Sequence, residues 1–138
     1  MSRLFSNQIF SDEWMIALKH EWNHSPQIHI PLQQAEFTAR IGYGFKGEIC
    51  ARGVLFIVDG KVLYAGSLDD ADIDLDYDLR ASRDNWNAWI ESGFGVSRLG
   101  PAIATNALEF VKGNYLKMIT NLSLGQSFLL HFQLMKKI

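Results

Sequence analysis

A short apolar run followed by a tight-turn dipeptide constrains the fold of this chain more than any other feature of its sequence. Residues 54–58 read Val-Leu-Phe-Ile-Val, Asp59-Gly60 follows directly, and Lys61–Ser67 returns as a second strand-like segment. Runs of β-branched and aromatic residues are typical of strands, and Asp-Gly is favoured in the two-residue type I′ turn. The sequence therefore predicts an antiparallel hairpin over residues 48–67, with its turn at Asp59-Gly60.

The rest of the chain alternates between helical and strand-like spacing. A first helix is predicted to begin after the N-cap Ser11 and to end near His24, before Pro26. Helical spacing recurs in four further segments, at residues 32–41, 82–93, 101–113 and 124–137. Further strands are predicted at residues 70–78 and 115–120. This mixture places the chain in the α+β class, and the last helix is apolar around most of its circumference.

Length and composition exclude several classes of protein. With 138 residues, the chain is predicted to form one domain over residues 1–138 with a core of its own. The longest uncharged stretch, residues 118–135, is interrupted by polar side chains, so we expect no integral membrane segment. The net charge of −2 gives no general attraction to nucleic acid. The N-terminus lacks the apolar run of a signal peptide, so a cytoplasmic protein is expected.

Residues 20–24 read His-Glu-Trp-Asn-His and match the H-E-x-x-H pattern of zinc hydrolases. In that pattern two imidazoles bind zinc from adjacent helical turns, and the glutamate acts as a general base. The expected third ligand is missing, because Gln27 and Ile30 stand where the longer pattern has Gly and His. We therefore expect an exposed helix end with no bound metal, and a zinc hydrolase using His20 and His24 stays a remote alternative.

Three other patterns lack the context that their chemistry needs. Residues 42–47 spell G-x-G-x-x-G, but helix-like sequence precedes them and strand-like sequence follows, the reverse of a dinucleotide-binding unit. We interpret these glycines as a turn from helix into sheet. Residues 70–78 alternate Asp with apolar residues and match no calcium loop, so a solvated acidic strand face is expected. Cys50 is expected to be an inert thiol, and we expect neither enzyme activity nor a cofactor.

Several motifs, taken in order, resemble the sterol carrier protein family of nonspecific lipid-transfer domains, especially its small stand-alone bacterial members. Residues 54–62 resemble the first hairpin of that family, and residues 71–75 resemble its third strand. Residues 85–93 resemble a helix that carries an aromatic residue and ends in Gly. Residues 101–118 resemble a proline-led helix, a Gly-containing turn and the fourth strand.

The resemblance implies a mainly antiparallel, twisted sheet of about five strands, covered by helices on one face, with an apolar tunnel between the layers. It also implies non-enzymatic binding or transfer of a fatty acid, an acyl-CoA or a sterol-like lipid. The residues expected to line the tunnel are apolar members of the predicted strands and helices: Phe56, Ile73, Leu75, Trp86, Trp89, Ile103, Leu108, Met118, Phe128, Phe132 and Met135. The alternative for each of them is a place in an ordinary filled core.

Two function classes stay open on the sequence. In the first, the chain carries a small hydrophobic ligand in an internal cavity. In the second, the chain is an interaction module, and its apolar C-terminal helix covers a partner or a second copy in a homodimer. Saturable binding of an acyl ligand separates these two classes.

Overall fold

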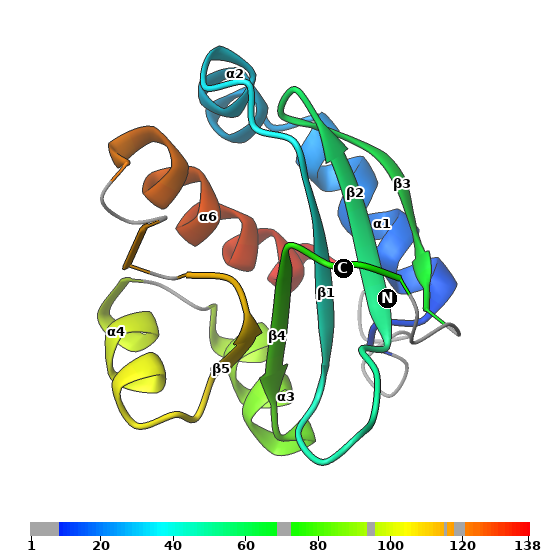
Figure 1. Ribbon diagram of the computed structural model, residues 1–138, viewed down its shortest axis with the longest axis vertical. Helices are drawn as coiled ribbons and strands as arrows, with labels where there is room; N and C mark the ends of the chain where they lie inside the picture. Colours follow the sequence, from blue (N-terminus) through cyan, green and yellow to red (C-terminus); the bar gives the residue numbers. More distant parts are fainter. Residues whose placement is uncertain (1–8, 69–72, 94–95, 115, 118–120) are drawn as a thin grey trace.

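The chain folds into a single sheet with helices on one of its faces (Figure 1). The computed structural model describes residues 9–68, 73–93, 96–114, 116–117 and 121–138. The elements follow one another as α1 (Asp12–Asn23), α2 (Pro26–Gln34), β1 (Ala39–Phe45), β2 (Gly53–Val58), β3 (Lys61–Ser67), β4 (Tyr77–Ala81), α3 (Arg83–Ser92), α4 (Val96–Ala104), β5 (Glu109–Lys112), α6 (Leu122–Leu134) and the 3-10 helix η2 (Met135–Lys137).

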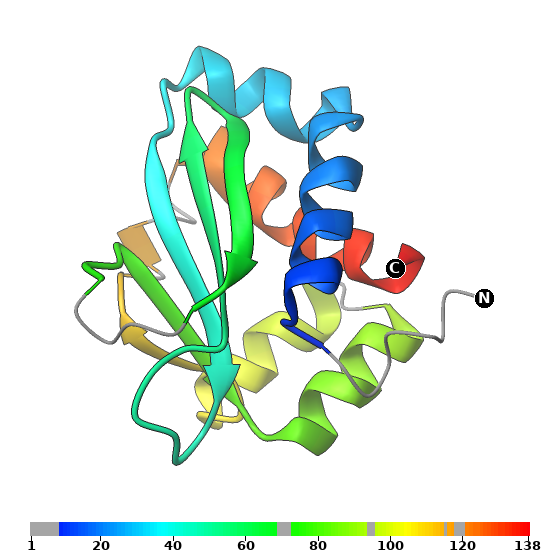
Figure 2. The same cartoon turned by 90° about the vertical axis from the view of Figure 1, so that its right-hand side faces the viewer.

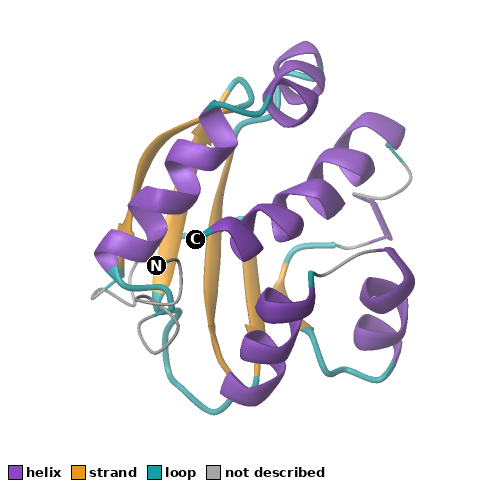
Figure 3. Cartoon of the chain, turned by 180° about the vertical axis from the view of Figure 1, so that it is seen from behind, coloured by secondary structure: helices purple, strands orange, loops and turns teal. Residues whose placement is uncertain are grey.

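The sheet contains five strands in the order β3-β2-β1-β4-β5. Neighbouring strands are antiparallel except for β1 and β4, which are parallel. The side and rear views show the described helices gathered on one face, which we call the helical face (Figures 2 and 3). The opposite face, here the outer face, carries none of them. The predicted α+β class with a mainly antiparallel sheet is confirmed.

The hairpin predicted from the Asp-Gly pair forms between β2 and β3. Val58 pairs with Lys61, so the loop has two residues, and both of them have positive φ: 47° for Asp59 and 85° for Gly60. That is the backbone of a type I′ turn. The indole of Trp22 donates a hydrogen bond of 2.8 Å to the carbonyl of Gly60, which ties the turn to α1. The strand before the turn starts at Gly53 and not at the predicted residue 48.

Helix α1 begins at the predicted cap and covers the free edge of the sheet. The Ser11 hydroxyl accepts a hydrogen bond from the amide of Trp14, and the helix ends at Asn23, as predicted. The side-chain amide of Asn23 both donates to the carbonyl of Val62 and accepts from its N–H, at 2.9 Å each. Since unpaired backbone groups on an edge strand invite pairing with another chain, these bonds protect β3.

The predicted helix over residues 32–41 is wrong beyond Gln34, because α2 ends there and the central strand β1 begins at Ala39. Of the glycines interpreted as a turn, Gly42 and Gly44 lie inside that strand, and Gly47 lies in a turn directly after it. A Cβ atom on Gly42 would lie 2.5 Å from Cδ1 of Leu75 and 3.1 Å from Cβ of Ala51. Glycine is therefore needed at this position for close packing on the outer face and not for a turn.

The acidic segment also differs from its prediction. Residues 73–76 form no strand, and β4 begins only at Tyr77. This break reverses the side-chain alternation, since Tyr77 packs against the helical-face core whereas Ile73 and Leu75 lie in the outer-face cluster. Residues 70–72 of the predicted strand lie outside the described residues.

The last third of the chain follows the predicted pattern with shifted boundaries. The helix predicted at residues 101–113 is correct only up to Ala104, where α4 ends with Pro101 inside it, and it is wrong for residues 109–112, which form the strand β5. The last strand is β5 at residues 109–112, and the strand predicted at 115–120 is wrong for residues 116 and 117, which are helical. Residues 115 and 118–120 lie outside the described residues. The predicted last helix corresponds to α6 followed by η2.

Among the described residues, no helix has the length and apolar character needed to cross a bilayer.

Candidate ligand-binding site

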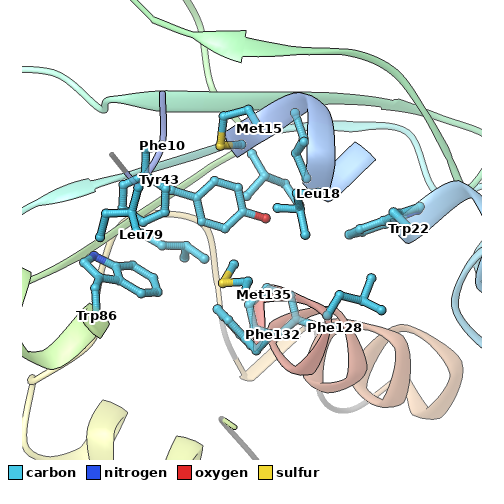
Figure 4. Close-up of a cluster of buried hydrophobic side chains, with 14 of the residues drawn as sticks. Phe10, Met15, Leu18, Trp22, Tyr43, Leu79, Trp86, Phe128, Phe132 and Met135 are labelled. Atoms are coloured by element: carbon cyan, nitrogen blue, oxygen red, sulfur yellow. The ribbon is translucent and has the colours of Figure 1, made fainter. Parts of the chain in front are cut away.

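Six of the predicted lining residues lie together between the sheet and the helices. Figure 4 shows Trp86, Phe128, Phe132 and Met135 among Phe10, Met15, Tyr43 and other side chains from the sheet and helices. The six side chains are buried in a single cluster and are at most 9% exposed: Trp86, Trp89, Leu108, Phe128, Phe132 and Met135. Ile103 packs against the cluster and is partly buried. Met118 lies outside the described residues.

Three predicted lining residues lie on the outer face and cannot line a space between the layers. Phe56, Ile73 and Leu75 belong to a separate cluster, in which Leu75 is 7% exposed. On β2 the side chains alternate, so Leu55 enters the helical-face core and Phe56 points the other way. The guanidinium of Arg40 lies 5.0 Å from the centre of the Phe56 ring. The prediction assigned these side chains to the wrong face.

A small apolar hollow lies between the end of α1, α2, β1 and α6. Its volume is about 10 Å³, and its accessible lining is entirely apolar. The lining residues are Trp22, Leu32, Phe37, Ile41, Leu124 and Phe128. Only Phe128 was predicted from the sequence. Of the others, Ile41 lies on the missed strand β1, whereas Trp22 and Leu124 lie on predicted helices, where their helical spacing was a local signal that could have found them.

A hydrogen-bonded pair of polar side chains lies beside the hollow and was not predicted. The Tyr43 hydroxyl on β1 lies 2.8 Å from Nε2 of His131 on α6, and both residues are fully buried. Nδ1 of His131 faces the carbonyl of Phe128, which only accepts hydrogen bonds. Nδ1 therefore carries the proton, and Nε2 accepts from the tyrosine.

Burial decides the charge state of this pair. Loss of hydration lowers the pKa of His131 to about 4, so the ring is uncharged at neutral pH. The same effect raises the pKa of Tyr43 and keeps its hydroxyl protonated. The pair can thus exchange hydrogen bonds but offers no charge to a ligand.

The outer face has a cavity of different character. Its volume is about 140 Å³, and its walls include Ala51, Leu68 and Leu75 together with Asp78 and Arg80. The Arg80 guanidinium donates to both carboxylate oxygens of Asp78, at 2.6 and 2.9 Å. Because Asp78 is 7% exposed and paired with Arg80, the predicted solvated acidic face is wrong at this residue.

The zinc-like motif lies at the end of α1. The rings of His20 and His24 are 4.1 Å apart, and Nδ1 of His24 lies 2.8 Å from the His20 carbonyl oxygen. Among the described residues, no group of three or more His, Cys, Asp or Glu side chains is placed to hold a metal ion. Cys50 is partly buried and is one of the residues that line the outer-face cavity.

Comparison with solved structures identifies the fold. No protein-family model matches the sequence, and no curated protein matches it significantly. A crystal structure of sterol carrier protein 2 superposes with a TM-score of 0.74 and 16% identity, covering 95% of this chain and 99% of the other. A solution structure from Thermus thermophilus, of a conserved hypothetical protein suggested to be a sterol carrier protein, gives 0.68 and 15%, covering 94% and 89%.

A third match extends the same likeness. The ubiquinone synthesis protein UbiJ-SCP2 superposes with a TM-score of 0.54 and 15% identity, covering 96% of each chain. Together the three structures show that this chain has the sterol carrier protein 2 fold, as the sequence resemblance implied.

Proposed function

We propose that this chain, which has the sterol carrier protein 2 fold, binds a hydrophobic ligand between its sheet and its helices and catalyses no reaction on it. The observation that carries the proposal is the apolar hollow between β1, α2 and α6, whose six lining side chains offer no polar surface. Ligand sites for small molecules are typically apolar and concave, with few polar groups. We place the ligand site at this hollow, where the helices would separate from the sheet to admit a ligand.

Helix α6 is the wall best suited to move. Its backbone packs closely against α2 and, less extensively, against α1, whereas it meets the sheet through side chains. Phe128, His131 and Phe132 supply the aromatic contacts on its inner side. An outward shift of α6 therefore separates side-chain layers without breaking hydrogen bonds of the sheet. We propose that Phe128, Phe132 and Met135 then contact the ligand.

The small volume of the hollow shows how far α6 must move to admit a ligand. The hollow of about 10 Å³ holds no more than about one water molecule, whereas ligand sites usually measure about 300–1,000 Å³. Burial of about 300 Å² of apolar ligand surface contributes roughly 7 kcal/mol before the costs of association and opening. Since that free energy alone corresponds to a Kd of about 10 μM, we expect an affinity no tighter than the micromolar range.

A displacement titration tests the proposal. Delipidated protein is titrated with a fluorescent fatty-acid analogue, which is then displaced by unlabelled lipids. We expect saturable binding at one site. Leu124→Trp replaces a leucine side chain by a bulky indole ring at the hollow and is expected to weaken binding by about tenfold or more. Phe56→Trp on the outer face is the matched control and is expected to leave binding unchanged. Absence of saturable binding, or equal losses in both variants, would refute this site.

The second candidate is an interaction module that covers a partner with α6, and the burial of this helix within the chain supports it less than the first. The described side chains of α6 are buried or partly buried apart from Gln126 and Gln133. Exposed large apolar side chains among the described residues lie elsewhere, on α1, α2, β2, β3, β5 and two connecting segments. Native mass measurement distinguishes the candidates, since a dimer that forms without ligand supports the module.

A further inference from the structure

The cavity on the outer face is a second space, separate from the hollow between sheet and helices. It lies on the side of the sheet that carries none of the described helices (Figures 2 and 3), and its volume is about 140 Å³. No described residue lines both the cavity and the hollow. Since an apolar cavity of about 150 Å³ holds one benzene ring, this cavity has room for a ligand of about one ring.

Two glycines of β1 make room for the side chains that form this cavity. A Cβ atom on Gly44 would lie 3.1 Å from Cδ and 3.2 Å from Nε of Arg80, and one on Gly42 would meet Leu75. Residues two apart on a strand face the same side of the sheet, so both glycines open the outer face. The guanidinium of Arg80 therefore lies close against the central strand, beside the apolar side chain of Leu75.

The ion pair at this cavity is buried but leaves hydrogen-bond donors unused. Asp78 is 7% exposed and Arg80 is 5% exposed, and a buried ion pair is a weak source of stability because both charges lose their hydration. A guanidinium has five N–H groups. Nε and one terminal nitrogen of Arg80 donate to Asp78, and the other terminal nitrogen donates to the carbonyl of Glu48 at 2.9 Å. Within the part of the chain that the structure describes, two N–H groups of Arg80 therefore have no partner.

The lining also carries a second cation. Lys112 forms an ion pair of 2.9 Å with Asp74, whose side chain is 87% exposed. Exposed pairs of this kind are weak, so Asp74 can return to water when a ligand takes its place. The hydrogen bond to Asp74 raises the pKa of Lys112, and the ammonium group is charged at neutral pH. Positive charge thus exceeds negative charge in the lining, beside walls that are otherwise mainly apolar: Ile49, Ala51, Leu68, Ile73, Leu75 and Val111.

We propose that the outer-face cavity binds a small carboxylate whose apolar body is about the size of one ring. The carboxylate accepts hydrogen bonds from the unused N–H groups of Arg80 and from Lys112, and such charge-assisted bonds are stronger than bonds between neutral groups. Asp78 holds the guanidinium in position from its other side. The ring contacts the apolar wall. This site does not depend on the proposed function, because the two spaces lie on opposite faces of the sheet.

The single cysteine of the chain provides a direct readout of this cavity. Cys50 is one of its lining residues, so a bound ligand shields the thiol from modification. The full-length chain reacts with dithiodipyridine at constant ionic strength, and the rate is measured against the concentration of benzoate or of benzamide. Benzamide has the same ring but no charge. We expect benzoate to slow the reaction saturably and to bind about tenfold more tightly than benzamide.

Variants assign the preference to the two cations. Lys112→Gln is expected to weaken benzoate about threefold and to leave benzamide unchanged, whereas Lys61→Gln, at the opposite edge of the sheet, is the matched control. Asp78→Leu combined with Arg80→Met removes both members of the ion pair, so that no buried charge is left without a partner. This double variant is expected to lose the preference for benzoate over benzamide.

The outcomes decide the inference without reference to lipid binding. Loss of the benzoate preference in the double variant, with a weaker effect in Lys112→Gln, supports it. Equal protection of Cys50 by benzoate and benzamide, or protection by neither, overturns it. Survival of the preference in the double variant also overturns it, because the charge is then recognised elsewhere. If the double variant lacks native circular dichroism, equal effects of Lys112→Gln and Lys61→Gln overturn it.

Discussion

Phe128→Ala provides the sharpest test of how the helical face is packed. The side chain is 4% exposed, and its ring centre lies 5.0 Å from that of Phe132 and 5.9 Å from that of Phe110. Removing the ring loses about 2 kcal/mol of apolar transfer free energy. Every ~50 Å³ of void that stays open adds about 1.2 kcal/mol. The variant is therefore expected to lower the free energy of unfolding by about 3–5 kcal/mol.

Urea unfolding and thermal melts measure this loss. For a chain of 138 residues the expected decrease in Tm is about 10–17 °C. Phe56→Ala is the control, because that ring is half-buried on the outer face and its loss is expected to cost about 1–1.5 kcal/mol. Benzene is expected to raise the Tm of Phe128→Ala and not that of the wild type, since the enlarged hollow is dry. Equal destabilisation by both variants would refute the reasoning.

The remaining predictions concern the turn, the sheet edge and the buried histidine. Gly60→Ala places a Cβ atom 2.6 Å from the carbonyl oxygen of His29 at a φ of 85°, so we expect the free energy of unfolding to fall by about 2–4 kcal/mol. Gly47 has a similar φ but open space around it, so Gly47→Ala is expected to cost about 1–2 kcal/mol. Similar losses for the two variants in urea unfolding would contradict this reasoning. Asn23→Ala removes both side-chain hydrogen bonds to β3, so the free energy of unfolding is expected to fall by about 1–2 kcal/mol. Light scattering is expected to increase, because the freed edge strand can pair with another chain. Unchanged stability would refute the role of Asn23 in protecting this edge. Folding lowers the pKa of His131 from 6.5 to about 4, so the ring is neutral in both the folded and the unfolded chain above about pH 6.5, and the contribution of this residue to the free energy of unfolding is then at its maximum. About 3 kcal/mol of it is lost as the pH falls toward 4, and His131→Gln is expected to remove this dependence in unfolding curves at graded pH.

The hairpin was predictable because all of its information is local. Asp59-Gly60 specifies the turn, and the flanking apolar run specifies the strands. The face of each side chain in that run was not predictable. Residues 54–58 are apolar without alternation because Leu55 and Ile57 pack in the helical-face core while Val54 and Phe56 pack in the outer-face cluster. The sequence therefore could not show that Phe56 points outward. Strand β1 was missed because Gly42 is required by contacts with Leu75 and Ala51, which are distant in sequence.

The candidate site was predictable only in part for the same reason. The spacing of Phe128, Phe132 and Met135 on one helix placed them together on an inner face, and the structure confirms that they share one core. The partner of His131 lies 88 residues away, on the strand that the sequence did not reveal. No local pattern distinguishes a histidine paired in the core from one that faces solvent.

Native mass spectrometry of the purified chain, mixed with a long-chain fatty acid, tests the central claim most directly. If the ligand binds between sheet and helices, the 15.7 kDa chain is expected to carry one lipid molecule. The same adduct is expected to persist in Phe56→Trp and to be lost in Leu124→Trp, which obstructs the hollow. A wild-type spectrum with no lipid adduct, or an adduct of equal intensity in both variants, would contradict the account.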